Sequence, residues 1–174
     1  LIGPKARHLN GSLDGDPSNG NQLDVWANAG FLIGLPESDV PQVQTFEDTD
    51  AGSLGEMSFE ELDPLARGYL DINCGHCHNP NATEGVASQL WLNIENDDPF
   101  NLGVCKRPGS AGKGTGGLEF DIVPGNADAS ILVFRVETEQ IGAMMPQIGR
   151  SLQHRAGAEL VRAWVDAMPP QNCE

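Results

Sequence analysis

Basic residues are scarce in this sequence. Its 174 residues include 10 Lys and Arg against 25 Asp and Glu, which gives a formal net charge of −15 at pH 7. Nucleic acids and anionic membranes repel such a surface, so we expect neither as a partner. The charge suits a basic partner or a saline environment, and an ordinary solvated acidic surface would look the same.

Long apolar runs are also missing. A membrane-spanning helix needs about 18 or more consecutive apolar residues, and the sequence has no such run, which predicts no membrane span in this chain. It has neither a signal peptide nor an initiator Met, so we expect a mature protein or a piece of a longer one. The length suits one domain, or one domain with an extension.

Cysteines are few, and two of the four stand in a motif, Cys74-Gly75-His76-Cys77-His78. This C-x-x-C-H pattern is the attachment signal for a c-type haem. Thiols two residues apart can form thioethers with the two vinyl groups on one porphyrin edge, and the next residue, His78, can then bind the iron as proximal ligand. The motif therefore predicts one covalently attached haem c, held by Cys74 and Cys77, and extracytoplasmic assembly.

Three other interpretations of the motif remain open. Disulfide exchangers of the thioredoxin class use the letters C-G-H-C, but there the motif follows a strand and opens a helix. A zinc site would need a second ligand pair at close spacing, which Cys105 and Cys173 do not provide. A structural disulfide between Cys74 and Cys77 would leave His78 without a role.

The remaining cysteines, Cys105 and Cys173, lie far apart in the sequence. In an oxidising compartment they can pair and close a long loop, and we predict that disulfide. Two free buried thiols are the alternative.

The hydrophobic pattern predicts a mostly α fold with long loops and a little β structure. We expect helices over 21–29, 64–73, 126–136 and 155–168, a short strand over 89–94 and an extended stretch over 120–123. Residues 1–57 are interpreted as a loop-rich N-terminal extension with a short helix, and residues 58–174 as the haem domain, cytochrome c-like in fold.

The helix before the motif is predicted to start at Asp63 and Pro64, although Ser58 and Glu61 resemble a capping box. Its apolar stripe would comprise Leu65, Tyr69 and Ile72, with Ala66 and Leu70 beside them. The face of the terminal helix would comprise Leu160, Val161, Trp164, Val165 and Met168. We expect the two helices to cross with Gly68 near Trp164.

The iron needs a sixth ligand or an open position. Met145 lies in an apolar loop stiffened by Pro146, which suits a thioether ligand on the distal side. Met144 and His154 are alternative ligands, His8 is expected at the surface, and His76 should point away from the iron. Met144 and Met145 as core filler is the competing interpretation.

A helix, C-x-x-C-H, a later Met-Pro loop and a terminal helix with a buried aromatic resemble a class I cytochrome c. The C-terminal haem domain of bacterial secreted diheme cytochromes is resembled by the segments NQLDVWANAGFLIG, ARGYLDINCGHCHNP, LGVCKRPGSAGKGTGGLEFDIVPGNADASILVFR and MMPQIGRSL, and by the terminal Cys173. That resemblance implies His78 and Met145 as axial ligands and Cys74 and Cys77 as thioether donors. Such proteins have another haem domain upstream, whereas this chain has one C-x-x-C-H.

We therefore expect one-electron transfer in the periplasm or outside a bacterial cell, by an electron carrier rather than an enzyme. Redox proteins, among them another haem domain or cytochrome, are the expected partners. Two alternatives stay open: a haem enzyme or oxidoreductase subunit (peroxidase-like or dehydrogenase-associated), and a unit of a multi-cytochrome assembly.

Overall fold

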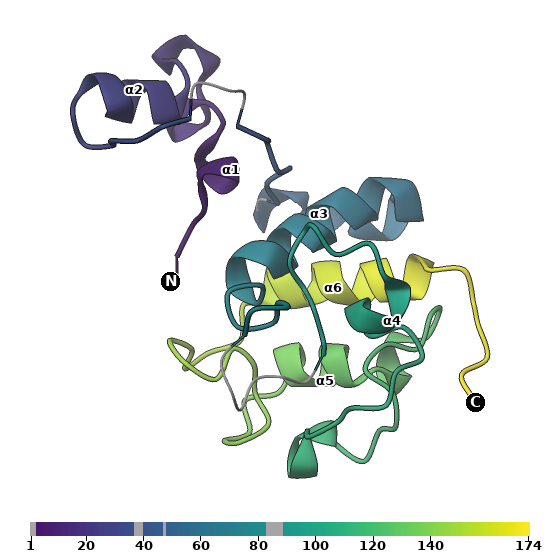
Figure 1. Ribbon diagram of the computed structural model, residues 1–174. Helices are drawn as coiled ribbons and strands as arrows, with labels where there is room; N and C mark the ends of the chain where they lie inside the picture. The colour runs from purple at the N-terminus through teal and green to yellow at the C-terminus, as the bar shows by residue number, and fades with distance from the viewer. Residues whose placement is uncertain (1–2, 37–39, 47, 83–88) are drawn as a thin grey trace. The chain divides into compact units, whose positions relative to one another are not determined.

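The computed structural model describes residues 3–36, 40–46, 48–82 and 89–174 (Figure 1). Regular structure in these ranges is mostly helical, which confirms the mostly α prediction. The helices are α1 Ala6–Leu9, η1 Leu13–Gly15, η2 Pro17–Asn19, α2 Gln22–Asn28, η3 Asp48–Glu56, α3 Phe59–Asn73, α4 Pro99–Leu102, η4 Gly112–Thr115, η5 Ala127–Ala129, α5 Ile131–Glu137 and α6 Arg155–Ala167.

The little β structure within the described ranges consists of isolated bridges, Ser12 with Asn21, Val104 with Ile122 and Phe120 with Ser130. The predicted strand over 89–94 is wrong. Backbone amides of this stretch donate to two unrelated segments, Trp91 to Asn101 O at 2.7 Å and Leu92 to His78 O at 2.8 Å, so no ladder forms.

The chain forms two compact units, Leu1–Thr45 and Phe46–Glu174. The first unit has little apolar core and depends on polar contacts. Asn21 caps α2 by accepting from Leu23 N at 2.9 Å, and its amide donates to Asn10 Oδ1 at 2.7 Å. The predicted helix over 21–29 is thus confirmed, with Asn21 as its cap.

The two units meet between Thr45 and Phe46, earlier in the chain than the boundary between residues 57 and 58 that the sequence predicts. Leu54, in η3, is buried in the core of the second unit, and Phe46 and Met57 pack against that core. The stretch from residue 46 onward therefore belongs with the haem-motif unit.

Helices α3, α5 and α6 form the core of the second unit, where α6 packs against both others (Figure 1). The predicted apolar face of α6 is confirmed, since each of its five members is buried, namely Leu160, Val161, Trp164, Val165 and Met168. The predicted crossing of the two long helices is confirmed as well.

Helix α3 begins at Phe59, so the predicted start at Pro64 is wrong. Ser58 Oγ accepts from Glu61 N at 3.4 Å, and Glu61 Oε2 accepts from Ser58 N at 2.8 Å, which completes a capping box. Asp63 instead accepts a hydrogen bond from Trp164 Nε1 at 2.9 Å. A buried indole N–H needs such a partner, so the carboxylate serves the helix crossing rather than the helix start.

The earlier start also changes the buried stripe of α3. The buried apolar members are Leu62, Leu65, Ala66 and Leu70, whereas Tyr69 is half-buried and Ile72 is 36% exposed. None of the helices in the described ranges is long and apolar enough to cross a membrane.

Candidate functional site

The C-x-x-C-H motif forms a tight turn directly after α3. The amides of Cys74 and Gly75 donate to Leu70 O at 2.8 and 2.9 Å, which ends the helix. The amides of Cys77 and His78 then donate to Cys74 O at 3.0 and 2.8 Å. The two cysteines and the histidine that the haem hypothesis needs, Cys74, Cys77 and His78, therefore lie within one turn.

Only glycine fits at the second position of the motif. A Cβ on Gly75 would lie 2.8 Å from Asp71 O, closer than real Cβ contacts, and 3.1 Å from Asn93 Cα, which is tighter than most of them. The motif turn therefore packs against the backbone of Asn93.

Two charged residues of α3 hold that neighbouring segment in place. Arg67 Nη2 donates to the carbonyls of Asn93, Ile94 and Asn96 at 3.4, 3.3 and 2.5 Å. Asp71, one helical turn later and 1% exposed, accepts from Ile94 N at 3.1 Å. Sequence analysis missed both residues, although charged residues four apart within an apolar stripe were a signal for them.

The four cysteines separate into two kinds. Cys105 and Cys173 form a disulfide, which confirms that prediction. Cys74, buried, and Cys77, half-buried, are both free thiols, so the two motif cysteines do not form the alternative disulfide.

The surroundings of Cys74 differ from those of a thiol nucleophile. Burial, with a smaller effect from Cys77, raises the pKa of Cys74 to about 12. Disulfide exchangers lower this pKa, commonly by placing the thiol at a helix N-terminus. Here the motif follows the C-terminal end of α3, which counts against the exchanger interpretation.

His78 is half-buried. Burial lowers its pKa, the Leu90 carbonyl opposes that change, and the positive charges of Arg135, His76 and Lys106 lower the pKa further. Its Nδ1 is buried with no hydrogen-bond partner among the described residues. A neutral imidazole with an unsatisfied buried nitrogen is in the form that binds metals.

His76 Nδ1 is also buried without a partner in the described part of the chain. That its side chain points away from an iron stays a prediction. Within the described residues, no group of three His, Cys, Asp or Glu side chains could hold a metal ion.

Met145 lies in the loop between α5 and α6, and both it and Met144 are half-buried. The loop folds back on α5, because Met145 N donates to Arg135 O at 2.8 Å and Arg135 Nε donates to Ala143 O at 2.8 Å. The charge of Arg135 also acts on His78. Arg135 therefore bonds the Met145 loop and also lowers the pKa of His78 through its charge.

The other histidines considered as ligands have different surroundings. His154 Nδ1 lies 3.0 Å from Tyr69 Oη, with the two rings 5.6 Å apart. His8 belongs to the first unit, where its Nδ1 accepts from Lys5 N at 2.9 Å.

A buried charged cluster accompanies the motif turn, and sequence analysis missed it. Lys106 and Asp121 are 4% and 5% exposed. Burial raises the pKa of Asp121 to about 6, although the charges of Lys106 and Arg135 oppose that change. Lys106, Asp121 and Arg135 form this cluster, and the carboxylate of Asp98 also acts on Lys106.

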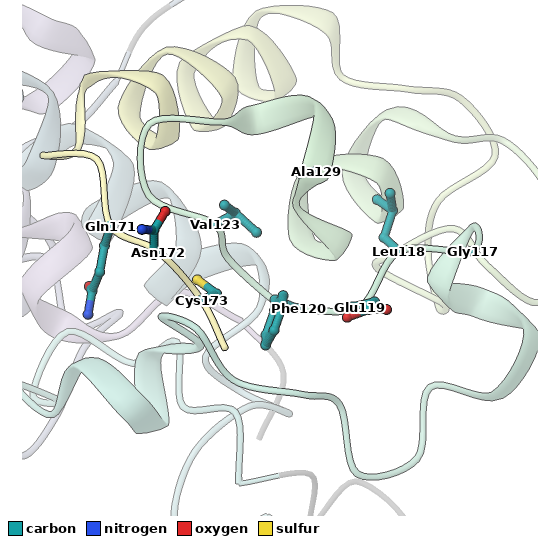
Figure 2. A pocket seen from close by; sticks show the side chains of 9 residues that line it. All are labelled: Gly117, Leu118, Glu119, Phe120, Val123, Ala129, Gln171, Asn172 and Cys173. Atoms are coloured by element: carbon teal, nitrogen blue, oxygen red, sulfur yellow. The ribbon is translucent and has the colours of Figure 1, made fainter.

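A separate hollow of about 370 Å³ lies beside the disulfide (Figure 2). None of Cys74, Cys77, His78 and Met145 borders it. Its walls come from the segment before α5 and the C-terminal tail, through Gly117, Leu118, Glu119, Phe120, Val123, Ala129, Gln171, Asn172 and Cys173.

Comparison with known proteins identified no match: no family model, no curated protein and no solved structure is significantly similar to this chain.

Proposed function

We propose that this chain is a cytochrome c-like domain that transfers single electrons outside the cytoplasm through one covalently attached haem c. The observation on which the proposal depends is the turn after α3, where free Cys74 and Cys77 stand beside a half-buried His78 whose buried Nδ1 has no partner among the described residues. The residues present fit the group, since they offer two thiols for thioethers and one neutral imidazole. The four remaining equatorial ligands of the iron belong to the porphyrin, so no cluster of protein ligands is needed.

Each site residue has a distinct role in this proposal. Cys74 and Cys77 fix the cofactor to the chain, His78 is the proximal ligand, and Met145 is the distal ligand. The haem supplies the one-electron couple, while the protein determines ligation, burial and hydrogen bonding. Thioether ligation favours the reduced iron and raises the potential relative to two imidazoles.

The buried charges support the same proposal. Lys106 and Arg135 both lower the pKa of His78, and the carboxylates of Asp121 and Asp98 act on Lys106 in turn. A haem has two propionate carboxylates, and cations near its proximal ligand would offset part of that negative charge.

Redox proteins are the proposed partners, and the periplasm or the cell exterior is the proposed location. A net charge of −15 favours a partner with a basic surface. Another haem domain, either upstream in a longer polypeptide or on a separate cytochrome, would agree with the resemblance to diheme proteins.

A spectroelectrochemical titration tests the proposed function. An electron carrier should be reduced reversibly in a one-electron step, and its ferric form should bind cyanide slowly because Met145 occupies the sixth position. Rapid binding of cyanide or peroxide would instead favour the haem-enzyme alternative. A protein without haem absorption would contradict the proposal outright.

A further inference from the structure

Arg150 donates to the backbone carbonyls of four residues. Its Nε donates to Leu152 O at 3.2 Å, and its Nη2 donates to Thr138 O at 2.9 Å. Its Nη1 donates to Arg135 O at 3.2 Å and also to Met145 O. One guanidinium thus connects four carbonyls, and the side chain is half-buried among them.

Two of these acceptors belong to the C-terminal end of α5, where helix carbonyls lack partners within the helix. Helix α5 ends at Glu137, and Thr138 is its C-cap. Arginine suits this position, because its planar fork presents several donors in a fixed arrangement. The same guanidinium also donates to Met145 O, so it hydrogen-bonds both the end of α5 and the backbone of the methionine loop.

The methionine loop is anchored on both sides of its backbone. Met145 N donates to Arg135 O at 2.8 Å, while Met145 O accepts from Arg150. Ala143 O accepts from Arg135 Nε at 2.8 Å. The guanidinium of Arg135 lies against Gly114, where a Cβ would be only 3.0 Å from Nη2. These bonds restrain the main chain of the loop and do not involve the thioether of Met145.

We propose that Arg150 is a positioning residue for the sixth ligand. By holding Met145 O against the end of α5, it keeps the loop in the single conformation from which the thioether reaches the iron. The inference rests on the proposed function, because it presupposes that Met145 binds a haem iron. When Arg150 is absent, the loop gains alternative conformations, and an external ligand displaces the thioether more readily.

The test compares Arg150→Gln, Arg150→Lys and the wild type, each as the haem-loaded protein. Arg155→Gln is the matched control, because Arg155 is exposed at the start of α6. The measurements are haem content, the weak red charge-transfer band of thioether-bound ferric iron, and the affinity of the ferric protein for imidazole. Imidazole competes directly with Met145, so a change in global stability alone would not alter its affinity for folded protein.

We expect Arg150→Gln to keep its haem and to bind imidazole about tenfold more tightly, the change that follows from losing roughly one charge-assisted hydrogen bond. Arg150→Lys keeps the charge but not the fork, and should show a smaller increase in the same direction. Arg155→Gln should match the wild type. If Arg150→Gln does not fold, Arg150→Lys decides the question.

Unchanged imidazole affinity in the folded Arg150 variants, with the charge-transfer band of the wild type present, would overturn this inference and leave the proposed function intact. A wild type that binds haem but lacks the band would refute Met145 as ligand, and the inference with it. A wild type without haem would refute the proposed function itself.

Discussion

At the scale of single residues, the two neighbouring methionines provide a sharp comparison. Met145 has its backbone fixed to Arg135, whereas Met144 N donates to Gln140 O at 3.0 Å within the preceding turn. Substituting Met145→His should abolish the thioether charge-transfer band and lower the reduction potential, because imidazole stabilises ferric iron more than a thioether does. Met144→Leu should leave both nearly unchanged. The opposite pattern, with the band lost only in Met144→Leu, would assign Met144 as the ligand.

Asp121 should make stability depend on pH in a defined window. Its pKa is about 6 in the folded protein, against an ordinary value of 3.8, because it is buried. The folded state therefore binds a proton that the unfolded state has lost between these two values, and stability falls as pH rises through this window. Below about pH 4 and above about pH 6 this contribution stays constant.

Asp121→Asn removes the ionisation and should remove that fall. The difference in the free energy of unfolding between the variant and the wild type should therefore shift by about 1–3 kcal/mol in favour of the variant as the pH rises from 4 to 7. Chemical denaturation of the haem-loaded proteins at several pH values provides the measurement. Parallel pH profiles for the two proteins would show that Asp121 does not titrate in this range.

At the scale of helices, the close approach between α3 and α6 occurs at Gly157 and Tyr69. A Cβ at Gly157 would lie 2.3 Å from Tyr69 Cζ. The Tyr69 ring also packs edge-on against the Phe46 ring, with 6.4 Å between the ring centroids, and its hydroxyl hydrogen-bonds His154. The sequence pointed instead to Gly68, which is buried in α3. Its proximity to Trp164 stays a prediction.

The Gly157 contact predicts that the same substitution changes stability in opposite directions with and without the Tyr69 ring. Gly157→Ala should destabilise the protein by about 1–3 kcal/mol, because the Tyr69 ring must move. In a Tyr69→Ala background the same substitution should stabilise by up to about 1 kcal/mol, since alanine is the better helix former. Thermal unfolding of the four proteins completes the double-mutant cycle. Equal effects in both backgrounds would mean that the two residues do not interact.

The sequence predicts a helix well when the residues that determine it are close together in the chain, and poorly when they are far apart. The terminal helix was predictable because the spacing of its own apolar residues, Leu160 to Val165, defines the buried face. The start of α3 was not, because two cap signals competed along the chain. Asp63 turned out to bond Trp164, 101 residues away, and no local pattern reports such a partner.

The residues of the candidate site also separate into those that the sequence predicts and those that only the fold shows. Cys74, Cys77 and His78 were identifiable because covalent attachment requires a fixed spacing. Arg67 and Arg150 were not, because their acceptors are backbone carbonyls, which every residue has. Only the fold shows which carbonyls converge on one guanidinium.

At the scale of the whole molecule, the disulfide joins residues 68 positions apart, linking the C-terminal tail to the segment before η4. Removing it by Cys105→Ala with Cys173→Ala should destabilise the protein by about 2–5 kcal/mol, because the unfolded chain regains the freedom of a long loop. Chemical denaturation of the variant and the wild type measures the difference.

The four cysteines should differ in alkylation. Unfolded, unreduced protein should react at no cysteine, and after reduction only Cys105 and Cys173 should react, since thioethers resist thiol reductants. Labelling at Cys105 and Cys173 before reduction would refute the disulfide. Labelling at Cys74 and Cys77 would show that these thiols bear no cofactor.

The mass of the denatured wild-type chain, isolated from a host that assembles c-type cytochromes, tests the central claim most directly. Denaturation releases any cofactor held only by coordination, so what remains is covalently bound. We predict the mass of the polypeptide, with its one disulfide, plus a single haem, and fragmentation should locate that haem between Cys74 and Cys77. A mass equal to the polypeptide alone would contradict the account.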